Sequence, residues 1–199
     1  MTAIRERVGW DVRIRCDYNQ AYDAPTAVRS LRLLEPFDLD AAEQPLPIGD
    51  LLGMRWVQER TSVPLFLHEG FFSLSDVVSL TEAGGMGVLG INAERPGGIT
   101  AALRAIDYVS ARGMGTIIHN QPLGIGTAAH AHIAAARWDR LGHAPELAGD
   151  VMFSEHLVDR RYEVVDGEML LPGGAGWGIE VDRGALDRHL VAEPTVMTL

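Results

Sequence analysis

Apolar residues fall in short runs that alternate with longer stretches of helical periodicity. The first run, residues 11–17, alternates polar and apolar positions as a strand does. Asp23 and Pro25 then stand as an N-cap and an early helix proline before a helical stretch over 27–34. The same order recurs, with strands expected at 37–43, 63–69, 87–92 and 116–119. The helices after them are expected at 48–59, from Ser73 onwards, at 99–112 and at 127–140.

One polar residue closes each predicted strand, and the spacing between these residues is nearly constant. They are Asp17, Glu43, Glu69, Asn92, His119 and Glu146, separated by 26, 26, 23, 27 and 27 residues. That is one βα unit per step, and repeated βα units predict an α/β fold with a parallel sheet covered by helices. In a barrel the carboxyl ends of the strands converge on one face, whereas an open sheet spreads them along an edge. Polar residues at equivalent positions favour the barrel.

The pattern changes after Gly149. Residues 161–172 predict a hairpin that turns at Asp166-Gly167, and a glycine-rich loop over 172–180 precedes a short helix over 182–190. No interdomain linker is visible. The whole chain, 1–199, is therefore expected to form one barrel domain, with 161–199 as its hairpin and tail.

Composition excludes several classes of partner. Acidic residues number 27 against 17 basic ones, and this formal charge of -10 disfavours nucleic acid and anionic membranes. The apolar runs are too short for a membrane helix. Cys16, the only cysteine, excludes an intrachain disulfide and suits a cytoplasmic protein. All 17 basic residues are arginine, so this chain alone cannot use a lysine base or a Schiff base.

Several motifs follow one another in the order found in a known family. They are Asp17-Tyr-Asn19-Gln-Ala-Tyr, Glu43-Gln-Pro45, Val63-Pro64 leading to Glu69, Gly97-Gly98-Ile-Thr100, Glu146-Leu-Ala-Gly149, and Asp166-Gly followed by Gly-Trp-Gly-Ile-Glu-Val-Asp182. In these motifs the chain resembles the barrel domain of the enolase superfamily, in its mandelate racemase and muconate-lactonizing branch. The resemblance implies a partial TIM-type (β/α) barrel of about six βα units, plus the C-terminal hairpin extension.

The resemblance also implies a Mg²⁺ ion held by Asp17, Glu43 and Glu69, with a small-molecule carboxylate as substrate. Hard cations prefer such oxygen ligands. The alternative for each carboxylate is capping the next helix or pairing with a surface arginine. His68 alternates to the other side of its strand from Glu69, which favours a packing or supporting role over metal ligation.

Proton abstraction next to a carboxylate needs a base. His119 is the candidate, because histidine titrates near neutrality, and Asn92 is placed to orient its ring. The alternative for His119 is a hydrogen-bonded core histidine. Asn19 and Glu146 are candidate substrate contacts, against the alternatives of a turn-forming asparagine and a surface glutamate.

The chain also departs from the family pattern. A capping domain and two barrel strands with a Lys-x-Lys pair usually precede this segment, and Asn92 stands where many members have a lysine or an aspartate. Many members have Asp-Glu where this chain has His68-Glu69. The reaction class is expected to be isomerisation or β-elimination. These departures favour one-sided proton transfer, as in acid-sugar dehydration, over lactonization or a two-base epimerization. The alternatives are a catalytically silent barrel remnant, or a chain that needs a separate N-terminal segment. An incomplete barrel exposes sheet edges, which predicts a homo-oligomer in either case.

Overall fold

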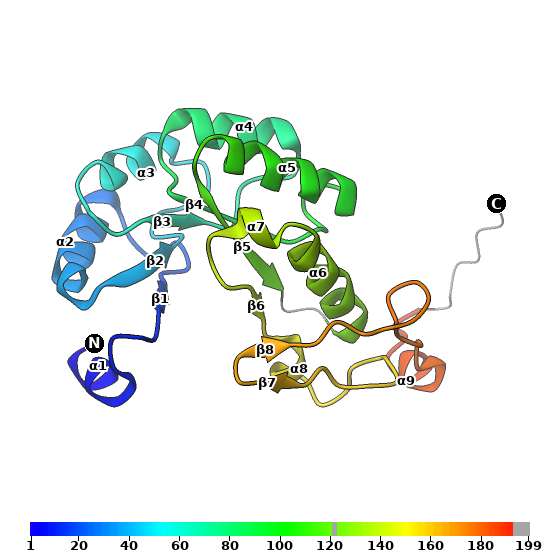
Figure 1. Ribbon diagram of the computed structural model, residues 1–199. Coiled ribbons are helices and arrows are strands. Elements are labelled where there is room, and N and C mark those ends of the chain that lie inside the picture. Colours follow the sequence, from blue (N-terminus) through cyan, green and yellow to red (C-terminus); the bar gives the residue numbers. More distant parts are fainter. Residues whose placement is uncertain (121–122, 193–199) are drawn as a thin grey trace. The chain divides into compact units, whose positions relative to one another are not determined.

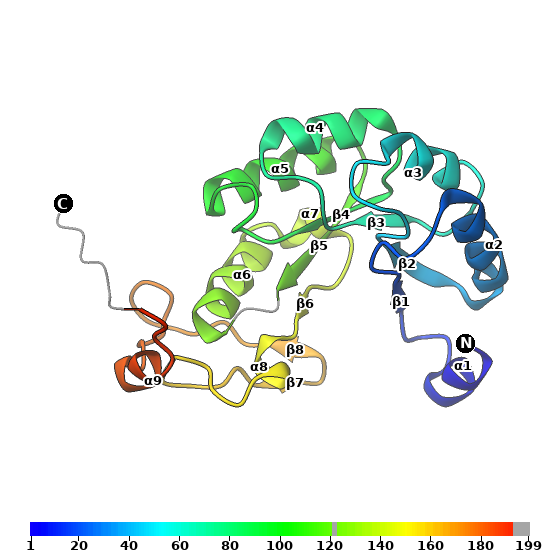
Figure 2. The same ribbon diagram turned by 180° about the vertical axis from the view of Figure 1, so that it is seen from behind.

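The computed structural model describes residues 1–120 and 123–192, which form two compact units (Figures 1 and 2). The first unit contains residues 1–119 and 137–144. The second contains 120–136 and the described residues from 145 onwards. No helix within these described ranges is long and apolar enough to cross a membrane.

The first unit is built on a parallel sheet whose strands follow the order of the sequence. The strands are β1 (Ile14–Asp17), β2 (Leu39–Glu43), β3 (Leu65–Leu67), β4 (Val88–Ile91) and β5 (Gly115–Asn120). Asp17 is in register with Glu43, and Glu43 with Phe66. Because all neighbours are parallel, the carboxyl ends of these strands meet at one edge of the sheet. The α/β fold expected from the repeated units is confirmed.

Helices connect these strands and cover one face of the sheet (Figure 1). They are α2 (Ala24–Leu34), α3 (Leu51–Gln58), α4 (Leu74–Ala83) and α5 (Ile99–Ala111), with a 3₁₀ turn, η1, at Glu35–Phe37 and a short α7 at Trp138–Leu141. Asp23, Asp50 and Ser73 each accept a hydrogen bond from a backbone N–H of the first turn that follows. Such caps satisfy donors that have no partner within the helix, so they set where α2, α3 and α4 begin.

The core of this unit lies on both faces of the sheet. Ala41, Phe66, Val88 and Ile117 form one fully buried cluster. On the helical side, Leu31, Met54, Leu80 and Ile106 are buried as well. Strands buried on both faces are typical of parallel sheets and explain their continuous apolar runs.

The sheet is curled, as contacts between groups at its two ends show. Gly142 forms a bridge with Thr116 of β5, four strands away from β1. Nevertheless, Arg13 donates to the Gly142 carbonyl at 3.3 Å, and Arg15 donates to the Ala144 carbonyl at 3.1 Å. Strands of a barrel curl in this way, and the partial TIM-type barrel implied by the family resemblance is confirmed.

Arg15, Asp40 and His143 form a cluster within this curl, called here the Asp40 cluster. Asp40 accepts hydrogen bonds from Arg15 Nε at 2.7 Å and from His143 Nδ1 at 3.1 Å. Burial alone would raise the pKa of Asp40, but the hydrogen bonds from His143 and Arg15 outweigh it and lower the pKa to about 2. The cluster is therefore an ionised carboxylate held between two donors.

The second unit contains α6 (Gly124–Ala136), β6 (Glu146–Leu147), α8 (Gly149–Met152), β7 (Val164–Val165), β8 (Glu168–Met169) and α9 (Arg183–Arg188). The chain packs closely around Gly124: a Cβ there would lie 2.3 Å from Cγ2 of Val158 and 2.7 Å from the His156 carbonyl oxygen. Its own carbonyl accepts a hydrogen bond from the Tyr162 hydroxyl at 3.0 Å. β7 and β8 pair across Asp166 and Gly167, both with positive φ, which confirms the predicted hairpin.

Two differences from the sequence prediction involve contacts between residues distant in sequence. The helix α1 (Thr2–Val8) was not predicted; it is anchored by buried Arg5, which donates to the carbonyl oxygens of Gly9, Val12, Phe37 and Asp38. The single helix expected over 127–140 is two helices, because Arg137 leaves helical geometry between α6 and α7. Its guanidinium pairs with Asp107 of α5 at 2.7 Å. Periodicity along the chain records neither of these long-range contacts.

Candidate functional site

Three side chains from different strands meet at the carboxyl-terminal edge of the first unit. Glu43 is the last residue of β2, His68 directly follows β3, and His119 lies in β5. Each offers one ligand atom, and these atoms all lie within 4.8 Å of one another. The set Glu43, His68 and His119 is called the triad below.

The triad is held by packing and by one polar contact. Nδ1 of His68 lies 3.1 Å from Oε1 of Glu43, and both residues are buried, with 7% and 8% of their surface exposed. The rings of His68 and His119 pack with their centroids 3.9 Å apart. Phe66 precedes His68 by two residues and therefore lies on the same face of the strand. Its ring centroid is 6.1 Å from that of His68 and 6.4 Å from that of His119.

Gly90 of β4 provides the space that these rings occupy. A Cβ at this position would overlap Cε2 of Phe66 and would lie 2.9 Å from Cβ of His68. The absence of a side chain at residue 90 therefore lets Phe66 and His68 lean across β4 toward His119 of β5.

Asp17, the first of the predicted Mg²⁺ ligands, lies at the end of β1, next to Glu43 in register. Its exposed carboxylate accepts two hydrogen bonds from Asn19, one from the backbone N–H and one from the side-chain amide, both at 2.8 Å. Asn19 and Gln20 have positive φ, so the chain turns sharply here. In the described arrangement the Asp17 carboxylate is turned to its own loop.

Glu69, the third predicted ligand, follows the triad residue His68. Its carboxylate accepts a hydrogen bond from Nε2 of Gln20, and its backbone N–H donates to Oε1 of Gln44 at 3.3 Å. Gln20 also accepts from the Ile48 N–H at 2.9 Å. These two glutamines, which the sequence prediction did not single out, hold the loops after β1, β2 and β3 together; each closely follows a strand-end carboxylate.

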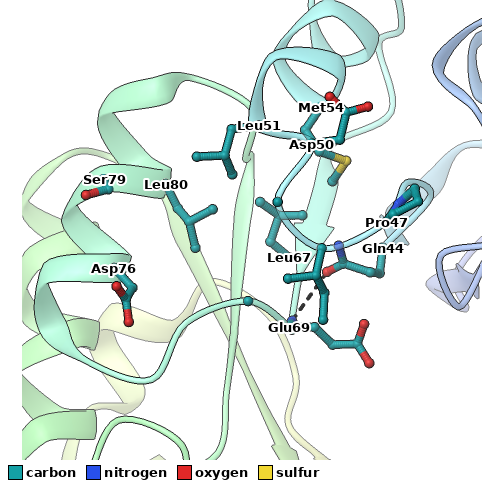
Figure 3. Close-up of a pocket in the computed structure, with 13 residues that line it drawn as sticks. Gln44, Pro47, Asp50, Leu51, Met54, Leu67, Glu69, Asp76, Ser79 and Leu80 are labelled. Carbon is teal, nitrogen blue, oxygen red and sulfur yellow. Dashed lines mark hydrogen bonds between the residues drawn. The ribbon is translucent and has the colours of Figure 1, made fainter.

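A cavity of about 150 Å³ adjoins Glu69 (Figure 3). Leu51, Met54, Leu67 and Leu80 line it between α3 and α4, with Asp50 and Asp76 beside them. Its lining includes no residue of the triad. Its volume is below the roughly 300 Å³ at which ligand pockets usually begin.

Asn92 and Glu146 lie in different surroundings. Asn92 follows β4, and its side-chain oxygen accepts a hydrogen bond from the Arg95 N–H at 3.3 Å. The Arg95 guanidinium in turn donates to the His68 carbonyl oxygen. Asn92 thus belongs to the loop that covers His68. Glu146 begins β6 in the second unit, half-buried.

Cys16 and Tyr18, which flank Asp17, are poor acid–base groups at neutral pH. Burial raises the pKa of the Cys16 thiol. Burial also raises the pKa of Tyr18 to about 12, against the opposing effect of its hydrogen bond to Ser30. Both groups stay protonated, so neither competes with the histidines for a role in proton transfer.

The two possible ligand sets differ in chemistry. Asp17, Glu43 and Glu69 would offer oxygen atoms alone, which fits Mg²⁺, and Asp17 and Glu69 would first leave Asn19 and Gln20. The triad offers one oxygen and two imidazole nitrogens already close together. Glu43 is common to both sets.

Comparisons with known proteins agree with one another. A family described as enolase C-terminal domain-like matches residues 1–185. A hydrophobic dipeptide epimerase from Enterococcus faecalis is 32% identical over 137 residues, covering 68% of this chain and 39% of that protein. A chloromuconate cycloisomerase from Cupriavidus pinatubonensis is 28% identical over 190 residues, covering 94% of this chain and 50% of that protein.

The comparison with solved structures also finds a muconate cycloisomerase. The crystal structure of muconate cycloisomerase from Pseudomonas fluorescens superimposes with a TM-score of 0.87 at 27% identity, covering 94% of this chain and 52% of that one. The chain thus spans about half the length of the curated relatives it matches.

Proposed function

This chain belongs to the enolase C-terminal domain-like family, and from that premise we propose that it abstracts a proton next to the carboxylate of a small molecule, with the help of a divalent cation. The observation that carries the proposal is the convergence of Glu43, His68 and His119 from three strand ends. The relatives named above are isomerases, which supports a reaction of this class.

Asp17, Glu43 and Glu69 would hold the cation, proposed here as Mg²⁺. A hard cation supplies Lewis-acid stabilisation of the second negative charge that appears on a carboxylate substrate when the α-proton leaves. Asp17 and Glu43 are register partners on β1 and β2, and Glu69 follows the neighbouring strand β3. Three adjacent strand ends therefore offer the carboxylates, once Asn19 and Gln20 release two of them.

His119 is the proposed base. An imidazole can accept a proton near neutral pH, and this ring lies at the same sheet edge as Glu43. The chain contains no lysine that could act in its place. Asn92 is proposed to orient the His119 ring, and Asn19 and Glu146 are proposed substrate contacts. A single base favours an isomerase or a dehydratase that transfers the proton on one side only.

The test is exchange of substrate α-protons with solvent deuterium, followed by nuclear magnetic resonance on the full chain with Mg²⁺. Acid sugars, dipeptides and muconolactone form the panel. We expect exchange with at least one class, and a loss of about 100-fold or more in His119→Asn, the range that removal of a general base costs. His189→Asn, which changes an exposed histidine of the second unit, is the control.

Mg²⁺ binding is measured separately by thermal unfolding. Saturating Mg²⁺ should raise the Tm of the chain, and Asp17→Ala should abolish that rise. Exchange that survives in His119→Asn would assign the base elsewhere. A folded chain with neither exchange nor Mg²⁺ response would support the alternative of a catalytically silent barrel remnant.

A further inference from the structure

We propose that a cavity at the amino-terminal end of the strands binds a small aromatic carboxylate. The cavity has a volume of about 350 Å³, within the range of about 300–1,000 Å³ that is typical of ligand pockets. Arg13 directly precedes β1, and the bridge between Gly142 and Thr116 lies near the start of β5. The residues that line the cavity all belong to the first unit; they are Arg13, Trp138, Leu141, Gly142, His143 and Ala144.

The charges around this cavity favour an anion. Nη1 of Arg13 lies 3.6 Å from Oδ1 of Asp40, and Nε of Arg15 lies 2.7 Å from Oδ2 of the same carboxylate. One carboxylate balances only one of two guanidinium groups, so these three side chains carry a net positive charge, and protonation of His143 would add to it. The lining residues include no carboxylate that could repel an anion.

Arg13 retains hydrogen-bond donors for a ligand. Its side chain is 64% exposed, and its Nη1 donates to the Gly142 carbonyl at 3.3 Å. Within the described parts of the chain, its Nε and Nη2 atoms make no hydrogen bond or ion pair. Two neighbouring N–H groups of a guanidinium can bind both oxygens of a carboxylate. The free donors therefore match a carboxylate group.

Trp138 adds an apolar surface to the same cavity. It is 66% exposed, whereas Leu141 of the same short helix α7 is buried. The face of an exposed indole can pack against another aromatic ring. A ligand with a carboxylate for Arg13 and a flat apolar body for Trp138 would use both features, whereas an inorganic anion would use the arginine alone.

One side of the cavity is fixed before a ligand binds. His143 donates from Nδ1 to Asp40 at 3.1 Å, and its ring packs against Gly115 of β5, where an added Cβ would lie 2.5 Å from the His143 Cδ2 atom. The Gly142 and Ala144 carbonyl oxygens already accept hydrogen bonds from arginines. A site that is already ordered loses less conformational entropy on binding.

Benzoate is the probe, with acetate and benzyl alcohol as ligands that have only the charge or only the ring. Isothermal titration calorimetry on the full chain without Mg²⁺ measures binding. We expect benzoate to bind with a Kd of about 1 mM or below, and the other two to bind at least about 10-fold more weakly. Arg13→Gln and Trp138→Ala should each weaken benzoate binding by about 10-fold or more. Arg29→Gln on α2 and Trp56→Ala on α3, both at exposed positions, are the matched controls.

Nuclear magnetic resonance locates the bound benzoate. The chain contains four tryptophans, and benzoate should shift the indole N–H signal of Trp138 most. This signal is identified by its loss in Trp138→Phe. Because His119 lies at the carboxyl-terminal edge, His119→Asn should bind benzoate as the wild type does.

The proposal is overturned if a folded chain does not bind benzoate at about 10 mM, ten times the expected Kd. It is also overturned by unchanged binding in Arg13→Gln, by a largest shift at another tryptophan, or by loss of binding in His119→Asn. Circular dichroism confirms folding, and Arg13→Lys, which lacks the paired donors, replaces Arg13→Gln where the glutamine variant unfolds. The deuterium-exchange assay with Mg²⁺ is separate, so its failure alone contradicts only the proposed function.

Discussion

Gly90 shows how a single missing side chain shapes the triad. Cε2 of Phe66 and Cβ of His68 occupy the volume that a Cβ at residue 90 would need. A methyl group there would push both side chains off β4, and His68 would lose its fixed distance to Glu43. The position of the triad therefore depends on a residue that contributes no chemistry.

Gly90→Ala is expected to lower the free energy of unfolding by about 1–3 kcal/mol, the usual cost of overpacking a core. Urea unfolding measures this change. Gly173→Ala is the matched control, because a Cβ there meets no atom within 4 Å. An unfolding free energy for Gly90→Ala equal to that of the control would show that Phe66 yields without cost.

Asp40 makes the stability of the first unit depend on pH. Its pKa is lowered from 3.8 to about 2 in the folded chain by His143 and Arg15, which outweigh burial. A lowered carboxylate pKa adds stability that is complete above about pH 4 and is lost as the pH falls toward 2. The shift corresponds to about 2 kcal/mol.

Urea unfolding between pH 2 and pH 7 tests this dependence. Asp40→Asn should be less stable than the wild type at pH 7 by about 2 kcal/mol, and the difference should shrink toward zero near pH 2. Glu163→Gln, an exposed carboxylate, is the control. A difference that stays constant over this range would contradict a role for the ionised carboxylate.

At the scale of elements, α1 depends on Arg5 more than on its own sequence. The guanidinium donates to four backbone carbonyl oxygens, at Gly9, Val12, Phe37 and Asp38. A helix of seven residues is marginal in isolation. Tertiary hydrogen bonds therefore decide whether α1 forms.

Arg5→Met is expected to destabilise the chain by about 2–4 kcal/mol, because it leaves four partly buried hydrogen-bond acceptors without their donor. Amide hydrogen exchange over residues 2–8 should also become fast. Arg7→Met, at an exposed position of the same helix, is the control. Unchanged protection of α1 in Arg5→Met would mean that packing alone holds the helix.

The elements that could be predicted are those with local determinants. Asp23, Asp50 and Ser73 cap helices with their own side chains, and Asp166-Gly167 turns the hairpin by backbone conformation. Arg5, Arg137 and His68 act on residues distant in sequence, so periodicity does not indicate their partners. The strand ends that carry the candidate site were predictable from spacing, whereas the contact of His68 with Glu43 was not. The roles of Asp17, Asn19, Glu69, Asn92 and Glu146 stay predictions.

At the scale of the whole molecule, β1 is a strand at the edge of the sheet. Among the described strands of the first unit, β1 pairs with β2 on one side only. Val12, just before it, is 47% exposed. An edge with unpaired backbone groups and apolar neighbours favours pairing with a second chain.

We therefore expect the chain to form a homo-oligomer, measured by light scattering after size-exclusion chromatography. Val12→Asp should shift the population toward monomer by adding a charge beside the edge. Leu33→Asp, at an exposed apolar position on α2, is the control. A monomeric wild-type chain at all concentrations would refute this expectation.

The contacts of Arg13 and Arg15 with the Gly142 and Ala144 carbonyls also set an order of events during synthesis. Each contact joins residues 129 positions apart. At about 5–20 residues per second, a ribosome needs on the order of 10 s to make the intervening chain. During that time β1 has left the ribosome without the groups that its arginines bind, and Asp40 lacks His143. An incomplete first unit with unpaired strands is prone to aggregation. A chaperone that binds unpaired strands would therefore act before residue 144 is translated.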